Sequence, residues 1–333
     1  MLSVGLALVP ALLFLATLIL LDSFKLVRPR AVAMAMGAGA LAALACVPLH
    51  DLLMSSGLTP KMFSRYVAPL TEETAKAVFV IALVRRRQVG FLVDAAVQGF
   101  AIGCGFGLLE NVFYLRAASH STPLLWLVRG LGTAMLHGTA TGIFAMMART
   151  AADRHPASWF RAFAPGWLIA IVIHSTFNHF VLPPVALTLL LMTLLPLLTL
   201  VVFHYSEAAT REWVTDGMDL DLGLLELVLS EIFPATRLGQ YLEQLRQRFP
   251  GHVVADMYCL LRLELELAVQ ARALLMAREA GLILPPDDDL RMSLQEIDYI
   301  QRSIGPTGMI ALRPLNVTTH RDRWHKYLLQ SSR

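Results

Sequence analysis

Long apolar runs dominate residues 2–204 of the chain. Seven stretches there are each close to the ~20 residues that a helix needs to cross the hydrocarbon core of a bilayer. They lie near residues 2–22, 31–54, 65–84, 90–113, 124–148, 162–181 and 183–204. The pattern predicts an all-α protein in which residues 1–204 form a polytopic transmembrane helical bundle of about seven spans.

The pattern changes after Tyr205. Charged and apolar residues follow each other with the period of amphipathic helices at 224–233, 237–249 and 253–279. We therefore expect residues 205–333 to form a cytoplasmic helical domain. A regulatory role with a cytoplasmic protein partner and a plain solubilising tail both agree with this composition.

The composition is that of a membrane protein. Hydrophobic residues make up 56% of the 333 residues and charged residues 16%, and the mean hydropathy is +0.58. The net charge is only +3, without a basic run with interleaved aromatics, so we expect no nucleic-acid partner. The three cysteines, Cys46, Cys104 and Cys259, form no CxxC pair and predict neither disulfides nor a cysteine zinc site.

Basic residues cluster after the first, third and fifth apolar stretches, and such loops tend to stay in the cytoplasm. These residues are Lys25, Arg28, Arg30, Arg85, Arg86, Arg87, Arg149, Arg154 and Arg161. The intervening loops carry few: Lys61, Arg65, Arg116 and Arg129. The pattern predicts an integral protein of the bacterial inner (plasma) membrane with its N-terminus outside and its C-terminus inside.

The stretch 65–84 carries three ionisable residues: Glu72, Glu73 and Lys76. A charge at the centre of a spanning helix costs on the order of 3 kcal/mol, so this group needs an explanation. Glu72 and Lys76 are four residues apart on one helix face, and we expect them to neutralise each other in part. Glu73 points about 100° away and needs another partner, a metal or a proton.

Later stretches add more polar groups: Glu110, His137, His174 and Asn178. With a rise of about 1.5 Å per residue, these side chains and the paired glutamates fall between the middle of the bilayer and its outer surface. One shared site is therefore feasible. His174 and Asn178 share a helix face, so the amide is suited to hold the imidazole or to bind a substrate carbonyl.

Two water-activating mechanisms fit this set of residues. In one, His137, His174 and Glu110 bind a divalent metal such as zinc, and another glutamate shuttles the proton. In the other, a glutamate is the direct general base, and the imidazole and amide stabilise the oxyanion. The chain has no HExxH motif, and the sequence leaves both mechanisms open.

The ordered motifs resemble the PrsW family over about residues 60–182. They are Glu72-Glu73-x-x-Lys76, Asp94 with the glycine-rich run to Phe106-x-x-x-Glu110-Asn111, His137-Gly138, and His174-x-x-x-Asn178. The family is similar to the CAAX-prenyl-protease-like membrane peptidases, which also combine paired glutamates with later histidines on a helical bundle.

The resemblance implies an intramembrane protease in which Glu72 and Glu73 are the paired catalytic acids. Glu110, His137 and His174 complete that site, Asn178 assists, and Lys76 tunes the charge of the acids without acting as a nucleophile. The implied substrate is a membrane-anchored protein such as an anti-sigma factor or a similar signalling protein, cut on the extracytoplasmic side.

Two other classes of function use the same residues differently. A proton- or ion-coupled transporter would relay protons through Glu72, Glu73, Glu110 and the histidines, although the chain shows no clear internal repeat. A non-enzymatic sensor or scaffold would act through residues 205–333 and tolerate loss of Glu73 or His174.

The predicted topology is testable with fused reporters. Fusions after Arg87 and Arg154 are expected to report the cytoplasm, and fusions after Ser56 and His120 the outer side, because the basic loops stay inside. Paired alkaline phosphatase and fluorescent protein fusions measure this. A mixed pattern at these four positions contradicts the seven-span arrangement.

Overall fold

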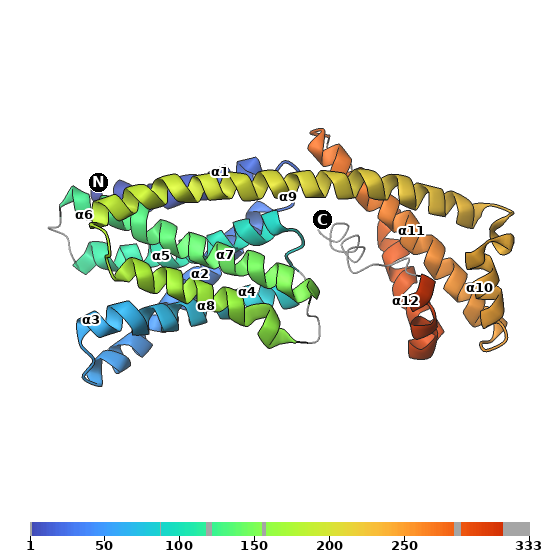
Figure 1. The fold of residues 1–333 in the computed structure, drawn as a ribbon, viewed down its shortest axis with the longest axis horizontal. Helices are drawn as coiled ribbons and strands as arrows, with labels where there is room; N and C mark the ends of the chain where they lie inside the picture. The colour runs from blue at the N-terminus through green and yellow to red at the C-terminus, as the bar shows by residue number, and fades with distance from the viewer. Residues whose placement is uncertain (1, 87, 118–121, 155–157, 283–287, 316–333) are drawn as a thin grey trace. The chain divides into compact units, whose positions relative to one another are not determined.

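The computed structural model describes residues 2–86, 88–117, 122–154, 158–282 and 288–315, so the predicted loop residues Arg87 and His120 lie outside it. Every regular element in these ranges is helical (Figure 1), and the prediction of an all-α protein is confirmed for them. The contacts divide the chain into two compact units, Met1–Glu207 and Ala208–Arg333.

The first unit holds the predicted membrane-spanning stretches. Its helices are α1 (Leu2–Leu21), α2 (Pro29–Ser55), α3 (Pro60–Met62), the π-helical segment η1 (Phe63–Val67), α4 (Ala68–Arg85), α5 (Leu92–Ala117), α6 (Pro123–Leu127), the π-helical segment η2 (Val128–Thr133), α7 (Ala134–Arg154), α8 (Trp159–Asn178) and the start of α9 (Pro184–Leu229). The predicted boundary at residue 204 falls inside α9, which continues as one helix to Leu229.

Four helices in the described part of the chain are long and apolar enough to cross a membrane. These segments are Val4–Leu21, Pro29–Ser55, Leu92–Arg116 and Trp159–Asn178. The predicted stretch 65–84 lies mostly on α4, whose charged residues lower its hydropathy. The stretch 124–148 is divided among α6, η2 and α7.

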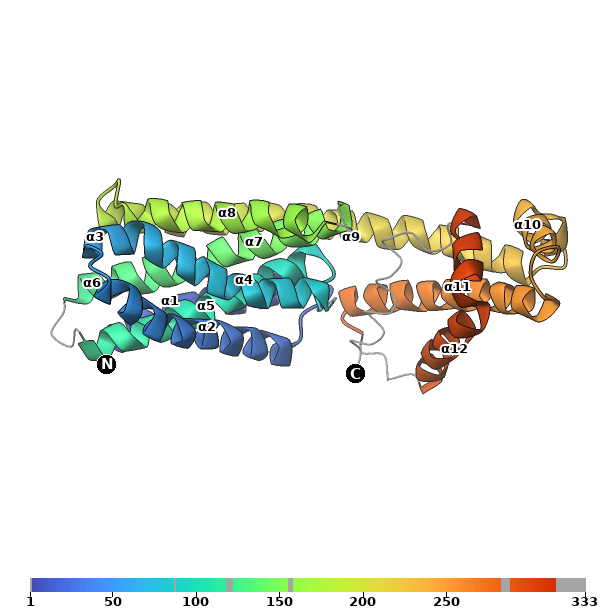
Figure 2. The ribbon, with the colours of Figure 1, turned by 90° about the horizontal axis from the view of Figure 1, so that it is seen from below.

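Helix α5 is the central helix of the first unit. Of its apolar window, 83% is buried inside the protein, against 22–33% in the other three candidate spans. It packs against α1, α2 and α7, and Figures 1 and 2 show it among these helices. An apolar helix buried to this extent is surrounded by protein, so its polar residues face other helices.

Glycines allow α5 to approach its neighbours at backbone distance. A Cβ atom at Gly39 of α2 would overlap the carbonyl oxygen of Ile102, and one at Gly105 would overlap that of Met36. On the opposite side, a Cβ at Gly103 would overlap the carbonyl oxygen of His137 on α7. Small residues of this kind are what lets helices pack closely in membranes.

The second unit is built from the end of α9 and from η3 (Phe233–Ala235), α10 (Arg237–Leu245), α11 (Gly251–Glu279), α12 (Asp288–Ala311) and η4 (Arg313–Leu315). Buried Arg272 on α11 pairs with Asp221, donates to the Gly217 carbonyl at 3.1 Å, and lies over the Trp213 ring. A Cβ at Gly217 would overlap this guanidinium, so the glycine makes room for the pair.

The close packing of α2 on α5 predicts a stability difference between two glycines of α2. Gly39→Leu is expected to destabilise the protein by about 2 kcal/mol, because the added side chain meets the backbone of α5. Gly37→Leu is the matched control, since nothing lies within 4 Å of a Cβ there. Thermal unfolding of both variants in detergent measures the difference, and equal midpoints contradict the packing.

Candidate active site

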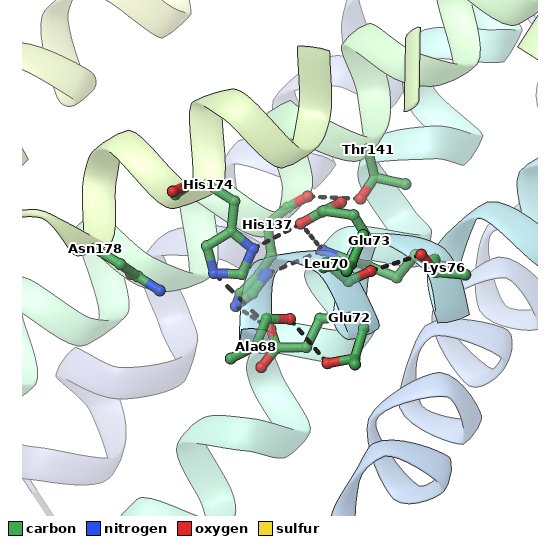
Figure 3. A network of polar contacts seen from close by, with 12 residues as sticks. Ala68, Leu70, Glu72, Glu73, Lys76, His137, Thr141, His174 and Asn178 are labelled. Carbon is green, nitrogen blue, oxygen red and sulfur yellow. Dashed lines mark hydrogen bonds and ion pairs between the residues drawn. The ribbon is translucent and has the colours of Figure 1, made fainter. Parts of the chain in front are cut away.

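Helices α4, α7 and α8 bring five ionisable residues of the predicted site together inside the first unit. Glu72, Glu73 and Lys76 come from α4, His137 from α7 and His174 from α8, and all five are buried. Figure 3 shows the two imidazoles facing the two carboxylates. The sequence expectation that these residues can share one site agrees with this arrangement.

Lys76 pairs with Glu73, whereas the sequence predicted a pair with Glu72. Its ammonium lies 2.7 Å from Glu73 Oε1 and 3.0 Å from His137 Nδ1. Residues three apart also share a helix face. On the face that carries Glu73, Lys76 also contacts the imidazole of His137. Glu73 Oε1 in turn lies 2.8 Å from His174 Nδ1. His174 is thus the further partner that Glu73 was expected to need.

Glu72 faces both imidazoles from the other side. Its Oε2 lies 3.9 Å from Nε2 of His137 and 3.9 Å from Nε2 of His174. Ligand atoms of these three residues lie within 4.8 Å of one another, which is close enough to hold one metal ion. Two imidazole nitrogens and a carboxylate oxygen are a donor set that zinc accepts.

The hydrogen bond at Nδ1 of His174 suits metal binding at its other ring nitrogen, Nε2. When Nδ1 carries the proton and donates it to Glu73, the Nε2 lone pair points toward Glu72. Metal-binding histidines usually have their second nitrogen held by a carboxylate in this way. The residues present therefore fit a divalent cation.

Glu110, which the sequence favoured as the third metal ligand, lies beside the group of Glu72, His137 and His174. Its Oε2 is 3.1 Å from His137 Nε2. Its side chain is 24% exposed, more than that of Glu72 or Glu73. Glu110 is therefore the carboxylate of the site best placed to exchange protons with water.

The backbone around His137 is fixed by α5. The close approach of Gly103 to the His137 carbonyl holds α7 against α5, and Thr141 donates its hydroxyl to the same carbonyl at 2.8 Å. The rings of His137 and His174 meet edge to face with centroids 4.8 Å apart. The close packing at Gly103 thus also fixes the position of His137.

Arg129 lies next to the site, although the sequence pattern assigned it only to a loop. It lies on η2, its side chain is 14% exposed, and its Nη2 is 3.1 Å from Glu110 Oε1. The signal available in the sequence was an arginine inside the apolar stretch 124–148. Such a charge is costly in a span unless a partner faces it.

Two residues of the predicted motifs make other contacts. Asn178 is half-buried, and its amide donates to the Ser64 carbonyl at 2.8 Å, which joins the end of α8 to η1. Asp94 accepts from the backbone N–H groups of Gly90 and Phe91 at 2.6 and 2.7 Å. These bonds fix the start of α5, where an acidic residue also suits the helix dipole.

Comparison with known protein families places these observations in context. The model of the PrsW family intramembrane metalloprotease matches residues 28–205, more than half of the chain. The matched range contains α2 to α8 and every residue of the site described above. Among curated proteins and solved structures, no match is found.

The geometry predicts zinc binding that depends on residues behind the ligands as well as on the ligands. Glu73→Ala is expected to weaken zinc binding by about 10–100-fold, because His174 loses the carboxylate that orients it. Glu72→Gln removes a ligand and is expected to weaken binding further. Competition with a chromogenic chelator measures the affinity. Asp51→Asn, an exposed acid on α2, is the control, and unchanged affinity in both site variants contradicts the assignment.

Proposed function

This chain belongs to the PrsW family of intramembrane metalloproteases, and we propose that it hydrolyses a peptide bond in a membrane-anchored protein substrate at the site of Glu72, His137 and His174. The observation that carries the proposal is the buried group of one carboxylate and two imidazoles with a second, more accessible carboxylate beside it. The family match favours this function over the transporter and scaffold alternatives.

The proposed ligands of a divalent metal such as zinc are Glu72, His137 and His174. When bound, such an ion makes water easier to deprotonate and polarises the peptide carbonyl. Glu73 supports this role by holding His174 through Nδ1, and Lys76 supports it by balancing the charge of Glu73. Lys76 has no nucleophilic role in the proposal.

Glu110 is the proposed general base and acid. Its carboxylate takes a proton from the attacking water and returns it to the amine that leaves when the C–N bond breaks. The observation that supports this role is the partial exposure of Glu110, which lies beside His137 and is more open to water than Glu72 or Glu73. Asn178, half-buried one turn beyond His174, is proposed to assist by contacting the substrate backbone.

The mechanism without a metal uses the same residues. A glutamate is then the direct base, and the imidazoles donate to the developing oxyanion. The hydrogen bond of His174 Nδ1 to Glu73 leaves Nε2 of His174 without a proton, which suits a metal ligand. The contact of Lys76 with His137 Nδ1 instead places the proton of His137 on Nε2, which suits donation to an oxyanion.

We also propose the cellular arrangement that the basic residues indicate. The chain crosses the bacterial inner membrane about seven times, with its N-terminus outside and its C-terminus inside. Residues 205–333 are then a cytoplasmic helical domain that contacts a protein partner. The substrate is an anti-sigma factor or a similar signalling protein, cut on the outer side.

Cleavage of a co-expressed, membrane-anchored reporter tests the proposal. Glu72→Gln, Glu110→Gln and His174→Ala are each expected to lower the cleavage rate at least about 100-fold, because each removes a group that activates water. Immunoblots of the membrane fraction check that protein levels stay equal, and Asp51→Asn is the control. Cleavage retained in all three variants overturns the proposal.

Chelation separates the two mechanisms in the same assay with purified protein. Loss of cleavage in chelator and recovery with zinc support the metal site. Full activity in chelator, together with inactive Glu110→Gln, supports the glutamate mechanism instead.

A further inference from the structure

Arg129 makes three contacts that converge on one outer corner of the site. Its Nη2 pairs with Glu110 Oε1 at 3.1 Å, and its Nε donates to Asn111 Oδ1 at 3.2 Å. Its guanidinium carbon lies 3.4 Å from the centroid of the Tyr114 ring. The guanidinium is therefore fixed in its plane by one stacking contact and in its direction by two polar ones.

The other oxygen of Glu110 faces His137. Oε1 pairs with Arg129 while Oε2 lies 3.1 Å from His137 Nε2. A carboxylate held at both oxygens has one orientation, whereas a free glutamate side chain has several rotamers. Arg129 thus determines where the proposed base of the site points.

Helix α1 contacts two residues beside Glu110 and Arg129, namely Asn111 and Gly130. Asn111, which is buried, donates its amide to the Ala7 carbonyl of α1 at 2.8 Å. Next to Arg129, a Cβ at Gly130 would overlap the Leu6 carbonyl of α1. A chain of contacts therefore runs from the α1 backbone through Asn111 and Arg129 to Glu110.

We propose that Arg129 is a positioning residue for Glu110 and that α1 is the support that holds Arg129 in place. Helix α1 lies outside the family match, which begins at residue 28, so this support is a feature of this chain beyond the matched region. The proposal rests on the proposed function, in which Glu110 moves the proton.

The simpler alternative is an arginine that only anchors the bundle at the membrane surface. Such a side chain extends toward water and headgroups. Arg129 is instead mostly buried, and its polar contacts go to Glu110 and to a buried amide. Arg116, exposed on the same helix as Glu110, has the setting of an anchor and provides the matched control.

Steady-state cleavage by the full-length protein in detergent tests the role of Arg129. Arg129→Ala is expected to lower kcat by up to about 100-fold with KM unchanged, because a displaced base affects the chemical step. Arg129→Lys keeps the charge but lacks the planar guanidinium, and its kcat is expected to lie between those of wild type and Arg129→Ala. Arg116→Ala is expected to match wild type.

Chemical rescue distinguishes positioning from a general structural effect. Guanidinium ion at low, non-denaturing concentration is expected to restore part of kcat to Arg129→Ala. Urea has nearly the same shape but no charge, and is expected to restore nothing. Equal rescue by urea, a rise in KM at constant kcat, or an unchanged kcat in Arg129→Ala overturns the positioning role.

A second pair of variants tests the support from α1. Gly130→Ala pushes against the Leu6 carbonyl and is expected to lower kcat in the same way as Arg129→Ala. Gly5→Ala is the control on α1, since nothing lies within 4 Å of a Cβ there. Wild-type kcat in Gly130→Ala overturns the support by α1.

The same assay separates this inference from the proposed function. If wild type does not cleave, or Glu110→Gln cleaves as wild type does, the proposed function fails. If wild type cleaves and Glu110→Gln does not, the proposed function stands, and the Arg129 and Gly130 series alone decides the inference.

Discussion

The contact of Glu73 with Lys76 and His174 is the interaction on which the rest of the site depends. Inside an apolar bundle a lone carboxylate is strongly disfavoured, and removing one partner of a buried pair typically costs about 3–5 kcal/mol. Lys76 and His174 meet the same oxygen of Glu73 from two helices. This pairing balances the charge and, at the same time, fixes the direction of His174.

Once Glu73 is satisfied, Glu72 is left to face the two imidazoles. Its 3.9 Å distances to both Nε2 atoms are too long for direct hydrogen bonds. The ligand atoms of the three residues lie within 4.8 Å of one another, a separation that suits one metal ion. The two adjacent glutamates therefore differ in their contacts: Glu73 is paired with Lys76 and His174, and Glu72 faces the two imidazoles at a longer distance.

The glycines of α5 set the second condition of the site. Because Gly103 brings α5 against the backbone of His137, Glu110 on α5 reaches the same imidazole that Lys76 contacts from α4. Arg129 and Asn111 then continue the polar contacts to α1. Each charged group at the site thus has an opposite charge or a dipole facing it, as a low-dielectric interior requires.

The sequence by itself determined the helical fold, the membrane setting and a set of candidate site residues, because apolar runs and charges within them are local properties of the chain. It named Glu72, Glu73, Lys76, Glu110, His137 and His174. Only the tertiary structure decided the partners. Within α4, Lys76 pairs with Glu73, on the side that faces His137 and His174. Across helices, Glu72 lies beside the two histidines and Arg129 pairs with Glu110. Such contacts depend on helix rotation and packing, which spacing along one helix does not specify.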